Sequence, residues 1–167
     1  MPTIALILMG ALSLILEATV LQAFQVAGVK PDLLLILLSF YALSHGNWYG
    51  ALLGAVYGLM EDMYLGRSLG LNALVKMLVG YAVGWGQEKL NRDNPLVPVL
   101  VVWLATLGAG FLFLLVAPLV GLHYPWGLSW VKTIVPVSVY NASLAFLGQS
   151  LKREGTEWLA RRRSLGS

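Results

Sequence analysis

Two side chains of opposite charge lie within long apolar runs of this sequence. Glu17 stands seven residues before Phe24, where the first run closes, and Lys76 stands seven residues after Leu69, where the fourth begins. At about 1.5 Å per helical residue, each lies about 10 Å below the same predicted boundary. Because an unpaired charge is costly in an apolar medium, we expect a buried ion pair between Glu17 and Lys76. The alternative, a proton relay, would need further acids or histidines in file, and the sequence offers none there.

A second acidic position is the pair Glu61-Asp62, which precedes two glycines, Gly66 and Gly70. We interpret Asp62, Gly66 and Gly70 as turn-structuring residues, with the Asp62 carboxylate accepting backbone N–H groups before the next helix. Cation binding by the acidic pair is the alternative, but a hard cation needs more oxygen ligands than two adjacent carboxylates supply.

No pattern typical of a catalytic site occurs in the chain. The sequence contains no cysteine, which excludes disulfides, thiolate metal sites and cysteine nucleophiles. His45 and His123 fall in separate predicted loops on opposite sides of the molecule, so they are not expected to share a metal. There is no Ser-His-Asp order, P-loop or glycine-rich nucleotide turn. We therefore expect a non-enzymatic protein with no catalytic residues, no cofactor and no metal.

These side chains must be positioned by apolar helices, because little else is present. Of 167 residues, 58% are apolar and only 11% are charged, against about 25% charged in a soluble domain. The mean hydropathy is +0.76. The composition predicts an all-α integral membrane protein of about six transmembrane helices. The expected helices cover residues 4–24, 33–43, 48–60, 69–85, 96–117 and 128–151.

The second and third runs are both short, and Gly46 lies between them. Joined into one helix from residue 32 to 61 they would measure about 45 Å, too long for a hydrocarbon core of about 30 Å without extreme tilt. We therefore predict a break at Gly46. Runs 32–43 and 48–60 then either cross the membrane separately or form a hairpin that enters it only in part.

The basic residues predict an orientation. Seven of them lie in the polar loop 86–95 and the tail 152–167, whereas only Lys30 and Arg67 lie in loops of the opposite side. By the positive-inside rule, both termini are cytoplasmic. The chain divides into one transmembrane domain, residues 1–151, and a basic cytoplasmic tail, residues 152–167.

The tail places an aromatic side chain next to a cluster of arginines, namely Trp158, Arg161, Arg162 and Arg163. This pattern is typical of an interfacial segment held by anionic lipids. A disordered positive segment that only sets the topology is the alternative. No nucleic-acid partner is expected, because the basic residues do not spread over a polar face.

Four glycines, Gly46, Gly50, Gly54 and Gly58, recur every four residues. On an α-helix this spacing produces a bare stripe, along which a second helix can approach backbone to backbone. The stripe is interpreted either as a docking surface for a helix of another protein or as a surface for packing inside the bundle.

A longer order of residues spans positions 21–85. It comprises Leu21-Gln22, Pro31-Asp32-Leu33-Leu34, Gly50, Gly54, Gly58-Leu59-Met60-Glu61-Asp62, Gly66, Leu69-Gly70-Leu71-Asn72-Ala73-Leu74 and Gly80-Tyr81. This order resembles the rod shape-determining protein MreD family of bacteria. The resemblance implies a six-helix fold similar to the substrate-binding subunit of energy-coupling-factor transporters.

The resemblance also implies a non-enzymatic scaffold in the cell-elongation machinery of the bacterial cytoplasmic (inner) membrane. Such a protein would bind an MreC-like single-span protein beside the MreB filament and the wall-synthesis complex of RodA and a penicillin-binding protein. It would thereby support peptidoglycan synthesis along the cell cylinder. A homo-oligomer is compatible with this role. The alternative is a small-molecule (vitamin-type) binding subunit of an energy-coupling-factor transporter, but polar groups in the predicted outer loops are sparse.

Overall fold

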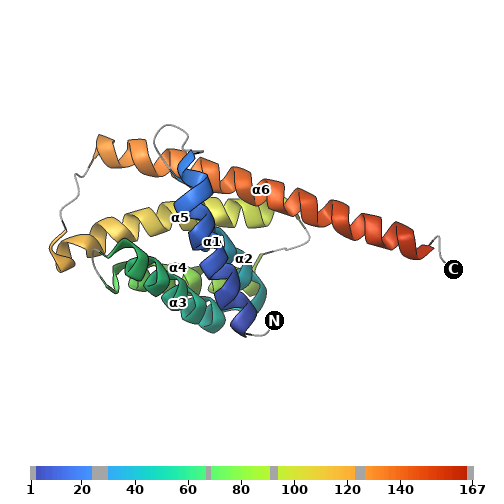
Figure 1. The fold of residues 1–167 in the computed structure, drawn as a ribbon, viewed down its shortest axis with the longest axis horizontal. Coiled ribbons are helices and arrows are strands. Elements are labelled where there is room, and N and C mark those ends of the chain that lie inside the picture. The colour runs from blue at the N-terminus through green and yellow to red at the C-terminus, as the bar shows by residue number, and fades with distance from the viewer. Residues whose placement is uncertain (1–2, 24–29, 67–68, 91–93, 123–126, 165–167) are drawn as a thin grey trace.

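The computed structural model describes residues 3–23, 30–66, 69–90, 94–122 and 127–164. Over these residues the chain is entirely helical, with six α-helices and no strand (Figure 1). The helices are α1 (Thr3–Ala23), α2 (Leu33–His45), α3 (Asn47–Leu65), α4 (Leu71–Trp85), α5 (Leu96–Val116) and α6 (Leu128–Ser164). Two short 3-10 turns, η1 (Gly86–Glu88) and η2 (Ala117–Val120), follow α4 and α5.

The break predicted between the second and third runs lies at Gly46, which ends α2 and precedes α3. Its φ of 95° is in the left-handed region, which glycine adopts without a steric penalty. The third helix is longer than predicted and includes Glu61 and Asp62. It ends at Gly66, where a φ of 63° lets the backbone N–H bond back to the carbonyl of Asp62.

Helix α2 is the centre of the bundle. It contacts each of the other five helices, and its side chains Leu34, Leu35, Leu38 and Ala42 are fully or almost fully buried. The most extensive interface joins α3 and α4, which run side by side (Figure 1). A helix of 13 residues is about 20 Å long. Burial among its neighbours, rather than its length, therefore holds α2 at the centre of the bundle.

The outer surface of the bundle is strongly apolar. Large side chains such as Ile4, Trp48 and Leu119 are 71%, 73% and 83% exposed. Among the described residues, two helical segments are long and apolar enough to cross a membrane, Leu96–Val120 and Trp130–Leu151. A soluble monomer seldom exposes so much contiguous apolar surface.

The last helix extends well past the rest of the bundle (Figure 1). Its backbone continues through the predicted tail as far as Ser164. The side chains of Trp158, Arg161, Arg162 and Arg163 lie outside the described part of the chain, so their interfacial role stays a prediction.

Candidate functional site

The glycine stripe of α3 is covered by α4. A Cβ atom built on Gly54 would lie 2.2 Å from the carbonyl oxygen of Lys76, and one on Gly50 would lie 2.3 Å from that of Gly80. A Cβ on Gly58 would lie 2.3 Å from the carbonyl oxygen of Asn72. The two backbones are therefore in direct contact. A foreign helix has no access to this stripe while α4 is in place, which corrects the docking interpretation in favour of packing inside the bundle.

The same packing extends to the end of the stripe. A Cβ on Gly84 of α4 would meet the backbone of Gly46 at 2.4 Å, and one on Gly46 would meet the side-chain oxygen of Gln87 at 2.6 Å. The start of α3 thus lies beside the end of α4, and the two helices run in opposite directions.

This close approach brings Lys76 into the interior of the bundle, where its side chain is 4% exposed. Its ammonium group forms ion pairs with the carboxylates of Asp32 and Glu61. The Asp32 pair is also a hydrogen bond, whereas Glu61 Oε2, 2.9 Å away, accepts none. Two carboxylates therefore share one buried cation.

The predicted ion pair between Glu17 and Lys76 is wrong. Glu17 accepts hydrogen bonds from the backbone N–H groups of Leu33 and Leu34, at the start of α2. Those N–H groups have no partner inside the helix, and the helix dipole favours a negative charge there. Equal depth in the membrane was not sufficient to identify the partner of Lys76, because Asp32 and Glu61 lie nearer to its ammonium group.

Asp32 connects this cluster to the last two helices. Its side chain accepts from the backbone N–H of Leu35 at 2.7 Å and so caps α2. Its own backbone N–H donates to the side-chain oxygen of Asn141 at 2.9 Å, and the Asn141 amide donates to Thr106 at 3.0 Å. Asn141 is fully buried, and Thr106 is 2% exposed.

Each of the six helices, or the cap directly before it, thus supplies one residue to a set of polar groups at the start of α2. Five of these residues bond to one another, and Glu17 joins them through the first backbone N–H groups of α2. We name this set the six-helix polar network: Glu17, Asp32, Glu61, Lys76, Thr106 and Asn141. Sequence reasoning did not identify Asp32, Glu61, Thr106 or Asn141 as members. The available signal was Asn141, an amide in the middle of an apolar run.

The turn before α4 is organised by Asp62, which is 1% exposed. Its carboxylate accepts from the backbone N–H groups of Gly70, Asn72 and Ala73 at 2.8, 3.1 and 3.2 Å. The side chain of Asn72 donates a fourth bond at 2.9 Å. Gly70, with a φ of 100°, adopts the left-handed conformation. Asp62 therefore makes the backbone contacts expected of a turn-structuring carboxylate.

The family model of the rod shape-determining protein MreD matches residues 1–147 of the 167. The chain belongs to the MreD family. No curated protein and no solved structure matches it. The MreD match extends well beyond residues 21–85, whose order of residues resembles the family. It includes every member of the six-helix polar network.

Membership of the MreD family gives the protein a role in rod shape determination at a membrane. MreD is not a known enzyme family. Within the described residues, no group of three or more His, Cys, Asp or Glu side chains is placed to hold a metal ion. The polar network joins the helices of this MreD-family protein to one another.

Proposed function

We propose that the protein is a non-enzymatic membrane scaffold of the bacterial elongation machinery. It binds an MreC-like single-span protein and supports peptidoglycan synthesis by RodA and a penicillin-binding protein beside the MreB filament. The observation that carries this proposal is the MreD family match over residues 1–147. A bundle whose helices are joined by one polar network and by backbone contacts suits a scaffold, because a scaffold must present a fixed surface.

The proposal includes six membrane-spanning helices with both termini in the cytoplasm. The apolar surface of the bundle and the excess of basic residues in loop 86–95 and the tail support this placement. The proposal also includes a fold similar to that of energy-coupling-factor substrate-binding subunits, which membership of the MreD family implies. Since α4 covers the glycine stripe, the partner must bind another surface of the bundle.

The proposal is tested by replacing the native MreD of a rod-shaped bacterium with a tagged copy of this chain, expressed together with its MreC-like partner. We expect the cells to stay rod-shaped and the partner to co-purify with the tag from detergent extracts. The control is the same strain carrying an unrelated six-helix membrane protein with the tag. Rounded cells despite normal membrane insertion, with no partner in the extract, would refute the scaffold role.

A further inference from the structure

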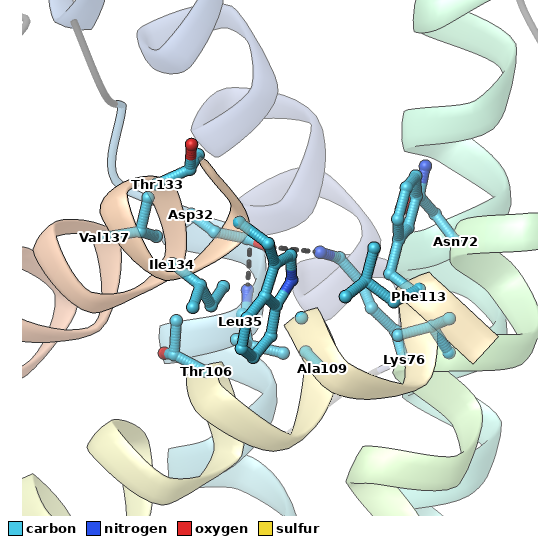
Figure 2. A pocket seen from close by; sticks show the side chains of 14 residues that line it. Asp32, Leu35, Asn72, Lys76, Thr106, Ala109, Phe113, Thr133, Ile134 and Val137 are labelled. Atoms are coloured by element: carbon cyan, nitrogen blue, oxygen red, sulfur yellow. Dashed lines mark hydrogen bonds and ion pairs between the residues drawn. The ribbon is translucent and has the colours of Figure 1, made fainter. Parts of the chain in front are cut away.

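A cavity lies beside the six-helix polar network, between α2, α4, α5 and α6. Its volume is about 390 Å³, inside the range of about 300–1,000 Å³ typical of small-molecule sites. Most of its wall is apolar and includes Leu35, Val75, Ala109, Phe113, Trp130 and Ile134. Figure 2 shows Asp32 and Lys76 meeting at this cavity, with the other labelled side chains around them. An apolar chamber with a few convergent polar groups is the usual form of a ligand site.

The ionic group that the cavity exposes most is the carboxylate of Asp32. The Asp32 side chain is 26% exposed, whereas that of Lys76 is 4% exposed. The ammonium group is buried and already faces two carboxylates, Asp32 and Glu61. A carboxylate accepts about four hydrogen bonds, and Asp32 receives two, from Leu35 and Lys76. A ligand that reaches Asp32 therefore meets open acceptor positions on a carboxylate.

We propose that this cavity binds a small amphiphile that carries a protonated primary amine. The amine donates to the Asp32 carboxylate, and the apolar body lies against Phe113, Trp130 and Ile134. An anionic head group is disfavoured, because Lys76 is buried behind its own two carboxylates. A neutral head group would make a weaker hydrogen bond to the Asp32 carboxylate than an ammonium group does. This proposal does not depend on partner binding and is tested on the isolated protein.

The head group is tested with three probes that share one body: phenylpropylamine, phenylpropanol and phenylpropanoate. Each is titrated calorimetrically into the full chain in lipid nanodiscs, with empty nanodiscs as the background. We expect the amine to bind about tenfold or more tightly than the other two, as a hydrogen bond to a charged group requires. Equal affinity of the three probes, or tighter binding of the acid, would overturn the proposal.

The location is tested by filling the cavity. Ala109→Phe places a ring inside it while every residue of the six-helix polar network is kept, and it should weaken amine binding at least about tenfold. Ala82→Phe is the matched control, because Ala82 lines a separate apolar hollow of about 360 Å³ between α4 and α5. If Ala109→Phe does not fold, Val137→Phe fills the same cavity from α6. Amine binding that survives the filling variant, or that is lost equally in Ala82→Phe, would place the amine elsewhere and refute the site.

The source of the amine is distinguished by the lipid. Titrations are repeated in nanodiscs of phosphatidylglycerol alone and in nanodiscs that also contain phosphatidylethanolamine. An aminophospholipid is supported as the occupant if the amine probe binds more weakly in the second set and if this difference is lost in Ala109→Phe. Unchanged binding supports a free amphiphilic amine.

Discussion

Lys76 is the residue on which the interior of the bundle depends most. A buried ammonium ion has lost its hydration, and only the neighbouring carboxylates of Asp32 and Glu61 compensate for that loss. The arrangement is asymmetric. Removal of the cation leaves two carboxylates close together without a counter-ion, whereas removal of one carboxylate leaves a neutral pair.

We therefore expect Lys76→Met to destabilise the protein by about 3–5 kcal/mol, the cost of breaking a buried pair. The double variant Lys76→Met/Glu61→Gln should recover part of this loss, because it removes one of the two carboxylates that would otherwise face each other without the cation. Thermal unfolding in detergent measures both. Lys132→Met, the same change at an exposed position of α6, is the control and should have little effect. Additive losses in the double variant would show that Lys76 and Glu61 are not coupled.

Contacts between residues close together in the sequence were predictable, and contacts between residues far apart in the sequence were not. The bonds of Asp62 reach at most eleven residues along the chain, so the glycine-bounded turn alone indicates them. The partners of Lys76 depend on which faces of four helices meet. The sequence does give the depth of each residue along its predicted helix, and that depth suggested Glu17 as the partner of Lys76. Only the packed bundle identifies Asp32, which lies 44 residues away.

At the scale of the elements, α3 and α4 form one unit. Helix boundaries followed from length, glycine and proline, and the break at Gly46 was predicted because an unbroken helix would be too long. The neighbour of the stripe could not be predicted, because small residues every four positions suit any helix. The structure pairs the stripe with Gly80 and Gly84, a second set of small residues on α4. At Gly50 and Gly46 both sides of the contact are glycine, whereas Gly54 and Gly58 meet the backbone of Lys76 and Asn72.

This pairing predicts opposite effects for one substitution at two places. Gly54→Ala should destabilise the protein by about 1–3 kcal/mol, because its Cβ meets the backbone of α4, which has no flexible atoms to move aside. Gly148→Ala meets nothing within 4 Å and should be neutral or stabilise α6 by up to about 1 kcal/mol. Thermal unfolding of both variants in the same detergent is the measurement. If Gly54→Ala unfolds at the same temperature as the natural protein, α3 and α4 are further apart at Gly54 than in this structure.

At the scale of the whole molecule, the arrangement of helices gives the orientation proposal a physical basis. Gly46 lies against Gly84 and near Gln87, so the turn between α2 and α3 is at the same end of the bundle as the end of α4. Lys89, part of the basic loop, follows directly after that end. Helices α2, α3 and α4 thus run up and down between the same two ends, which favours separate crossings over a hairpin that enters only in part.

Single cysteines test this orientation, since the natural chain has none. In intact cells, a membrane-impermeant maleimide should label Leu69→Cys, which is 73% exposed at the start of α4. It should label Asn94→Cys only after the inner membrane is permeabilised, because that residue belongs to the basic loop. Asn47→Cys, at the turn between α2 and α3, should behave like Asn94→Cys. Labelling of Asn94→Cys in intact cells would invert the topology. Labelling of Asn47→Cys alone in intact cells would mean that α2 and α3 do not cross, because their turn would then lie on the outer side.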